Sequence, residues 1–250
     1  MKKRICLAIL MLAGAAAVFG ADFSLSAGAG GLAGGFFTRY MLKADGTVDG
    51  NRVKINAGQE MDQFNYGLFA FFDASYGEFS VSFQNGANTF KEPVDIAELG
   101  SADRSGKGWE PVLGLSLLGK YPFNLNERFT VFPMLGVNYQ ICLDQARTMP
   151  AGNVYDRTNG LHEKDKDGNA YKLSDWNSFW IDLGGGVDFA LASGFFLRGE
   201  LLYGFRLMTP YEIKNLEMMK SMTGDPNPKL GGLTSGPSIR LSAGYRFFKN

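Results

Sequence analysis

Nine charged residues stand at alternating positions within otherwise apolar or glycine-rich stretches, and they are the main candidates for chemistry. They are Asp73, Lys120, Asp182, Asp188, Arg198, Glu200, Arg206, Arg240 and Arg246. Alternation places each of them on the face of a strand opposite its bulky apolar neighbours. Enclosed charges must be paired, because an unpaired buried charge is strongly destabilising. Such a set predicts either an internal ion-pair network or a charge-selective conduit.

A second candidate is His162, the only histidine of the chain. Paired with Ser174 it would resemble the base and nucleophile of a lipid-modifying enzyme. The spacing of the two residues carries no information about contact, and a histidine in a long connection is usually solvated. We therefore expect no enzymatic activity and no catalytic residues.

The same connection contains an acidic fragment that partly resembles a calcium-binding loop. It comprises Glu163, Asp165, Asp167, Gly168 and Asn169. The twelfth position counted from Glu163 is Ser174, where a calcium loop has a bidentate glutamate. Lys164 and Lys166 interleave with the acids, so a solvated turn is favoured and no metal is expected.

A third motif, Gly28-Ala29-Gly30-Gly31-Leu32-Ala33, superficially fits a dinucleotide-binding fingerprint. That fingerprint needs a strand before it and a helix after it, and no helical pattern follows here. A glycine-rich strand is the better interpretation, and no cofactor is expected.

The chain opens with a predicted signal peptide over residues 1–20. Lys2, Lys3 and Arg4 precede an apolar stretch that ends in small residues. Cleavage after Ala21 is the alternative site. Removing the leader leaves 22 of the 25 basic residues against 25 acidic ones, a net charge of −3. It also removes Cys6, so the mature chain 21–250 holds only Cys142 and no internal disulfide. The lack of a basic excess argues against nucleic acid as a partner.

The nine charges must be positioned by strands, because apolar residues recur at every second position and not with the 3.6-residue period of a helix. Eight segments are predicted, and they are Phe23–Tyr40, Gln63–Ser75, Glu78–Ala87, Trp109–Tyr121, Arg128–Asp144, Trp176–Leu191, Gly194–Met208 and Gly236–Phe248. Short connections alternate with long ones, which run near Met41–Asp62, Asn88–Gly108, Gln145–Asp175 and Thr209–Ser235. This alternation is typical of an all-β, antiparallel, up-and-down transmembrane barrel with short periplasmic turns and four long extracellular loops.

The composition of the two strand faces indicates which one points toward lipid. The chain has 33 glycines, which are common on one face of the strands, and 21 phenylalanines, which are common on the other. The residues of the polar face are small, as the narrow interior of an eight-stranded barrel requires. It carries Gly28, Gly30, Ser80, Ser82, Gly114, Ser116, Gly136, Gly184, Gly186, Gly204 and Gly244. Aromatic residues of outward parity near the short-turn ends predict a membrane belt, and they are Phe23, Phe72, Phe79, Tyr121, Phe129, Phe189, Phe195, Tyr245 and Phe247.

The C-terminal segment Ser242-Ala243-Gly244-Tyr245-Arg246-Phe247 is similar to the closing strand of small outer-membrane barrels of the OmpX, OmpA and OmpW type. In those families this aromatic pattern is read by the barrel assembly machinery, which assigns an assembly role to Gly244, Tyr245 and Phe247. This chain departs from the pattern by continuing for three further residues. The resemblance implies the bacterial outer membrane, lipopolysaccharide-type lipids and the assembly machinery as surroundings and partners.

The resemblance also implies a non-enzymatic function of one of two kinds. The first is a narrow passive conduit or structural barrel for small molecules, and the second is a loop-mediated adhesin that binds a host surface. Inward apolar residues would suit an OmpW-like path for apolar solutes or serve as filler, and these are Leu32, Phe69, Phe71, Phe132 and Met134. Because eight strands leave little open bore, a plugged lumen is favoured over an open one.

Three local features complete the predictions. Thr209-Pro210-Tyr211-Glu212 is an N-cap, a first-turn proline and a capping box, which predicts a short helix to about Met222. Pro133 lacks an N–H in mid-strand, which predicts a bulge or distortion. A hairpin turning about Ala192 would place Arg198 opposite Gly186, and Glu200 opposite Gly184.

Overall fold

The computed structural model describes residues 24–48, 51–96, 100–144, 146–148, 154–156, 172–207, 209–225 and 227–249. Eight long strands dominate it. They are β1 Ser24–Val48, β2 Asn51–Ala74, β3 Gly77–Ile96, β4 Gly100–Lys120, β6 Phe129–Cys142, β9 Ser178–Ala190, β10 Phe195–Arg206 and β11 Lys229–Lys249. Shorter elements are β5 Phe123–Asn124, β7 Ala146–Thr148, β8 Val154–Asp156, the 3-10 turns η1 Leu173–Trp176 and η2 Ala192–Gly194, and the helix α2 Pro210–Thr223.

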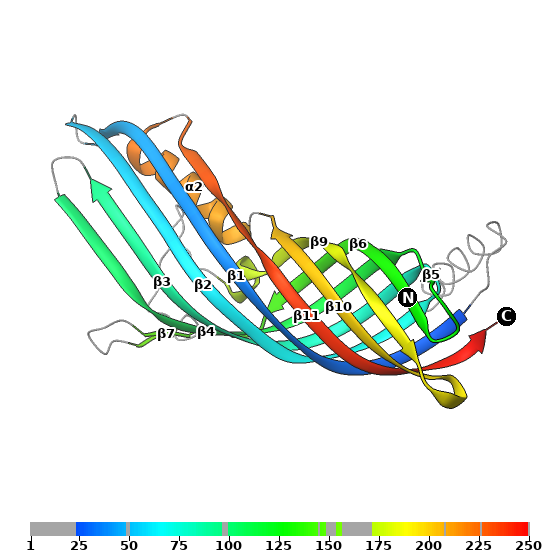
Figure 1. The fold of residues 1–250 in the computed structure, drawn as a ribbon. Coiled ribbons are helices and arrows are strands. Elements are labelled where there is room, and N and C mark those ends of the chain that lie inside the picture. Colours follow the sequence, from blue (N-terminus) through cyan, green and yellow to red (C-terminus); the bar gives the residue numbers. More distant parts are fainter. Residues whose placement is uncertain are drawn as a thin grey trace.

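The eight long strands close into a ring in which each pairs antiparallel with its neighbours. β1 pairs with β2, β2 with β3, β3 with β4, and β4 with β6. The ring continues through β9, β10 and β11 and returns to β1, where Ser24 lies opposite Lys249. This closure confirms the predicted eight-stranded antiparallel barrel. Figure 1 shows the start of β1 and the end of β11 at the same end of the barrel, which we call the short-turn end.

The wall of the barrel is uneven in height. β1, β2, β3, β4 and β11 have 20 to 25 residues each, whereas β6, β9 and β10 have 12 to 14. In Figure 1 the long strands rise beyond the short ones at the end opposite the short turns. We call these five strands the tall wall.

The tall wall corrects two predicted long connections. Residues 41–62 and 88–108 belong mostly to strands, with only 49–50 and 97–99 between them. Backbone pairing continues there while the apolar alternation stops, because outward residues such as Lys43, Asp45 and Arg52 are charged and exposed. The other two predicted connections contain β7, β8 and η1, and α2 with the first part of β11.

Two predictions of local geometry were wrong. The β9–β10 hairpin pairs Arg198 with Asp188 and Glu200 with Gly186, a shift of two residues from the expected register. The cause is that the turn through η2 is centred on Ser193, which has a positive φ of 61°, one residue later than predicted. Pro133 causes no register shift, since it pairs regularly with Gly185. Its carbonyl accepts from Tyr121 N–H on the β4 side, where the β4 strand ends, so the missing donor deprives no ladder partner.

The outer face of the ring is apolar and exposed. Leu68 and Leu241 are 72% and 64% exposed, whereas the inward Glu78 and Arg198 are 0% and 3% exposed. This distribution inverts that of a water-soluble barrel and defines a transmembrane one. Along β6 the outward rings of Phe129 and Tyr139 are ten residues apart, which spans about 25 Å for a tilted strand and matches the apolar band of a membrane barrel.

The predicted aromatic belt surrounds the short-turn end. Six of its members form three direct cross-strand pairs, namely Phe72 with Phe79, Phe129 with Phe189, and Phe195 with Tyr245. Tyr121 contacts the rings of Tyr76 and Phe123, and Tyr245 contacts Phe247. Phe23 lies outside the described residues. Rings at this level are typical of a membrane interface.

The predicted helix is present as α2, and both hydrogen bonds of its capping box form between Thr209 and Glu212. α2 lies against the inner face of β1 near the top of the tall wall (Figure 1). Gly46 of β1 allows this approach, because a Cβ there would stand 1.8 Å from the Thr223 carbonyl oxygen. Among the described helices none is long and apolar enough to cross a bilayer.

Candidate functional site: the barrel lumen

The lumen near the short-turn end contains an ion-pair network centred on Arg198. Its guanidinium bonds to Asp188 on the neighbouring strand β9 at 2.6 Å. It also reaches across the barrel to Asp73 of β2 and Glu78 of β3, each at 2.7 Å. Lys120 of β4 completes this group by pairing with Asp73. One arginine therefore connects strands from opposite sides of the ring.

Arg240 of β11 forms the second centre of the network. It bonds to Glu78 at 2.9 Å and lies 3.1 Å from Glu200. Arg246 approaches Asp188 at 3.7 Å. The connected network thus has four acids and four bases, so its formal charges balance. We call these eight residues the plug, and they are Asp73, Glu78, Asp188, Glu200, Lys120, Arg198, Arg240 and Arg246.

Aromatic rings fill the spaces between the charges of the plug. The Arg198 guanidinium lies 4.7 Å from the ring centre of Phe71, and 5.1 Å from those of Phe132 and Phe196. Arg240 lies 4.1 Å from the ring centre of Phe69. Cation–π attraction stabilises such arrangements further when water is excluded. Phe69, Phe71 and Phe132 are buried against these charges, and Met134 is buried in an apolar cluster with Phe132.

Glycines on neighbouring strands make room for the rings. A Cβ at Gly28 would stand 2.5 Å from the Phe71 ring, and one at Gly186 would stand 2.5 Å from the Phe132 ring. The same holds at Gly244, where it would stand 2.4 Å from the Phe196 ring. The small face therefore gives space to long inward side chains, which together occlude the bore.

Seven of the nine predicted charges belong to the plug, and two do not. Arg206 lies at the other end of the lumen, and Asp182 lies in the lumen between the plug and Arg206. Sequence reasoning missed Glu78, although it touches both central arginines. Alternation could have identified Glu78, because it directly precedes the outward belt residue Phe79 and must therefore point inward. It was missed because it lies next to a turn, where alternation is hard to assign.

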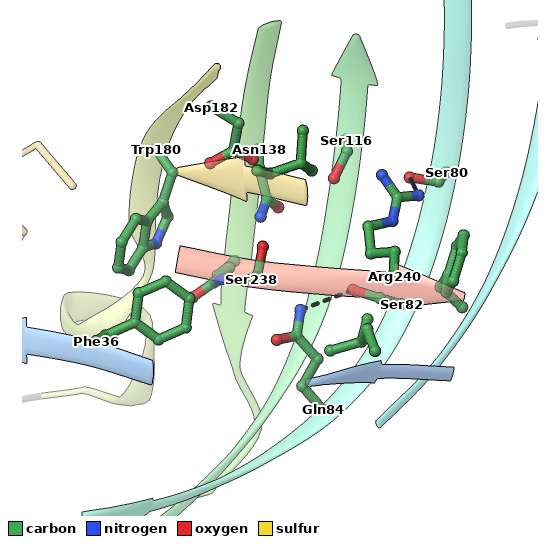
Figure 2. A pocket seen from close by; sticks show the side chains of 14 residues that line it. Phe36, Ser80, Ser82, Gln84, Ser116, Asn138, Trp180, Asp182, Ser238 and Arg240 are labelled. Carbon is green, nitrogen blue, oxygen red and sulfur yellow. Dashed lines mark hydrogen bonds between the residues drawn. The ribbon is translucent and has the colours of Figure 1, made fainter. Parts of the chain in front are cut away.

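Beyond the plug the lumen widens into a chamber lined largely by uncharged polar side chains, shown in Figure 2. Its volume is about 40 Å³, which is space for a few water molecules. Gln84 donates to Ser82, its neighbour on the inward face of β3, at 2.9 Å. The remaining lining residues are Leu32, Phe36, Phe69, Ser80, Ser116, Asn138, Gln140, Trp180, Asp182, Leu202, Ser238 and Arg240.

α2 and its anchors lie at the mouth of the lumen. Arg206 pairs with Glu212 of the helix and also donates to the hydroxyl of Tyr40 on β1. Lys214 of the helix pairs with Asp175 of η1 at 2.8 Å, and the Tyr211 ring contacts Trp176. α2 therefore docks on the mouth of the barrel.

The other sequence candidates fall in different places. Gly244, Tyr245 and Phe247 lie in β11, with both rings on the exposed outer face. Ser174 lies in η1, whereas His162 and the acidic fragment 163–169 fall outside the described residues. Within the described ranges no group of three or more histidine, cysteine or acidic residues is arranged to hold a metal ion.

Comparisons with known proteins place the fold in context. No protein-family model matches the chain, and no curated protein matches it. Among solved structures it is similar to the outer membrane protein OprG from Pseudomonas aeruginosa, with 12% identity, 90% of this chain and 95% of that chain covered, and a TM-score of 0.36. It is also similar to Ail of Yersinia pestis, with 15% identity, coverage of 90% and 99%, and a TM-score of 0.30.

A third similar structure is the outer membrane protein AlkL, with 16% identity, coverage of 88% and 90%, and a TM-score of 0.23. All three are small outer-membrane β-barrels. Similarity at this level concerns the general fold alone, and the closed ring of strand pairs itself defines the class of this protein.

Proposed function

We propose that this chain is a bacterial outer-membrane protein that acts without catalysis as a sealed structural barrel. The observation that supports it best is the plug, in which eight paired charges and the rings between them occupy the lumen. Eight strands enclose a space only just wide enough for side chains, so a filled cross-section leaves no continuous aqueous path. Charges held in short pairs also offer little attraction to a passing ion.

The surroundings that we propose follow from the same barrel. Cleavage of residues 1–20 would deliver the chain to the periplasm, and the assembly machinery would read Gly244, Tyr245 and Phe247 in the closing strand. The apolar band would contact lipopolysaccharide-type lipids. The tall wall would then extend from the outer leaflet, because the short turns face the periplasm in such barrels.

Conductance in planar bilayers tests the sealed barrel. We expect the refolded native protein to give no stepwise current. Replacing Arg198 and Glu78 together by serine removes one charge of each sign, leaves the remaining charges balanced, and should produce conductance steps. The matched control replaces Arg39 and Asp62, an exposed outer pair at 3.1 Å, by serine and should stay silent. Regular steps from the native protein would contradict the proposal and favour the narrow conduit.

A surface-binding role is the second candidate, and the tall wall favours it. β1 and β2 carry exposed charges far above the apolar band, including Lys43, Asp45, Arg52 and Lys54. Replacing residues 45–54 by Asn-Gly would shorten this hairpin while keeping the pairing below it. Under this candidate, the shortened protein folds and loses binding to host-surface proteins. Unchanged binding after the equivalent shortening of every projecting segment would exclude the adhesin.

The absence of catalysis has its own test. Lipid A extracted from cells that produce the native protein should match lipid A from cells that produce the His162→Ala variant. A modification that is present only with the native protein would replace our proposal with a lipid-modifying enzyme.

A further inference from the structure

The lumen contains one carboxylate that the plug does not neutralise. Asp182 of β9 is 8% exposed and lines the chamber. The plug already balances four acids against four bases, and within the described residues no cation lies within 4.0 Å of Asp182. An ionised carboxylate enclosed in this way is destabilising unless positive charge and hydrogen-bond donors accompany it.

Uncharged polar groups and aromatic rings flank this carboxylate, which also interacts by a side-chain hydrogen bond with Asn138 and electrostatically with Arg240. Asn138 of β6 lies on the adjacent strand, opposite Trp180, and faces the same chamber (Figure 2). The Asn138 Oδ1 atom is buried and has no hydrogen-bond partner in the part of the chain that the structure describes. It therefore offers an acceptor that nothing in the described lumen uses.

Two aromatic rings complete the surroundings. Trp180 shares the inward face of β9 with Asp182, and its ring centre lies 4.7 Å from that of Phe36. The positions converge beside Gly204, where a Cβ would stand 2.7 Å from Asp182 Oδ1 and 3.1 Å from Trp180 Cε3. A carboxylate oxygen and the indole ring thus border the same small space.

Arg240 also lines the chamber but is committed to other partners. Its guanidinium bonds to Glu78 at 2.9 Å and to Ser80 at 3.0 Å, and it lies 3.1 Å from Glu200. Arg240 interacts electrostatically with Asp182, but its ion pairs within 4.0 Å in the described residues are with Glu78 and Glu200. Asp182 therefore has no cation of its own in direct contact among the described residues.

We propose that the chamber binds a compact monovalent cation, an alkali metal ion, beside Asp182. The carboxylate supplies the counter-charge, and Asn138 Oδ1 supplies a neutral oxygen, the ligand type that hard cations prefer. The Trp180 and Phe36 rings add cation–π attraction. A single carboxylate matches a single positive charge, and about 40 Å³ admits an ion with a few waters but not a large organic cation.

Fluorescence quenching by caesium tests this site, because a heavy cation quenches an indole that it contacts. The Trp109→Phe and Trp176→Phe substitutions leave Trp180 as the only tryptophan. The folded protein in detergent is titrated with CsCl, and N-methylglucamine chloride holds the ionic strength constant. We expect saturable quenching of Trp180. In the Asp182→Asn variant the half-saturating Cs⁺ concentration should rise at least about tenfold, the effect of removing roughly 1.4 kcal/mol of binding free energy.

The matched control is Asp62→Asn, which removes an exposed carboxylate from the outer face and should leave the titration unchanged. Asn138→Ala should raise the half-saturating concentration several-fold, and it decides the matter if Asp182→Asn fails to fold. Quenching that rises linearly without saturation would overturn the proposal, as would equal saturation in the native and Asn138→Ala proteins. If the quenching test fails, the native protein should still give no stepwise current in planar bilayers. A failure of the cation site can therefore be told apart from a failure of the sealed barrel.

Discussion

The plug and the chamber above it are lined by the same strands, yet polar groups are accommodated differently in the two. In the plug, full charges are held in short pairs, and rings and glycines fill the space between them. In the chamber, hydroxyl and amide groups predominate, and Asn138 Oδ1 is left without a partner among the described residues.

The difference shows how one narrow lumen contains two kinds of environment. Enclosed charges tolerate no missing partner, because each lost pair leaves a charge in a medium of low polarity. Neutral hydroxyls and amides depend less on any single contact and coexist with water. We therefore expect the plug to be sensitive to substitution and the chamber to be tolerant.

The largest expected effect comes from breaking the plug at its centre. Arg198→Leu leaves Asp73, Glu78 and Asp188 without their shared cation and should lower the free energy of unfolding by about 3–5 kcal/mol. Urea titration in detergent, followed by the heat-dependent shift on gels, measures it. Ser116→Ala in the chamber is the comparison and should cost less than about 0.5 kcal/mol. Equal losses for the two variants would remove the distinction between the regions.

The next largest difference in stability between the plug and the chamber is expected from replacing a glycine by the larger alanine. Gly186→Ala places a Cβ 2.5 Å from the Phe132 ring and should cost about 1–3 kcal/mol, because the ring is enclosed by the plug. Gly114→Ala places a Cβ 2.4 Å from Ser82 Oγ, a rotatable hydroxyl, and should cost less than about 1 kcal/mol. The same unfolding titration compares them, and a reversed order would contradict a rigid plug.

Removing a neutral hydrogen bond from the chamber should have a smaller effect. Gln84→Ala deletes the 2.9 Å bond to Ser82, and the free energy of unfolding should fall by about 0.5–1.5 kcal/mol. Water is expected to hydrate the hydroxyl that remains. A loss as large as that of Arg198→Leu would show that the chamber is as tightly coupled as the plug.

The smallest effect is expected outside the bilayer, on the tall wall. Arg52 bonds to Asp45 at 2.7 Å, and this hydrogen bond lowers the pKa of the exposed Asp45 carboxyl. The pair therefore contributes above the unfolded-state pKa of Asp45, and its contribution is lost as the pH falls through the lowered value. In Arg52→Ala, an NMR titration of Asp45 should show its pKa return toward 3.8, and the free energy of unfolding at neutral pH should fall by less than in Gln84→Ala. An unmoved pKa would show that the pair does not form in solution.

Local order along the chain was sufficient to predict much of this molecule. Period-two alternation in segments such as Gly194–Met208 predicted strands, and the contrast of small and bulky faces predicted which side meets lipid. The capping box at Thr209 predicted α2. Each of these features depends on neighbours within a few residues, so the sequence carries it directly.

Strand length, strand register and the contacts between the inward charges were determined only by the closed ring of strands. The apolar period ends at the bilayer surface while backbone hydrogen bonds do not, so the length of β1 and β2 was hidden. The turn through η2 set the register that brings Arg198 opposite Asp188, and ring closure brought Glu78 and Asp73 to the same guanidinium from more than a hundred residues away. Parity along a strand tells which side chains face inward. Which inward charges meet depends on strand order, register and the width of the barrel, and these exist only in the assembled fold.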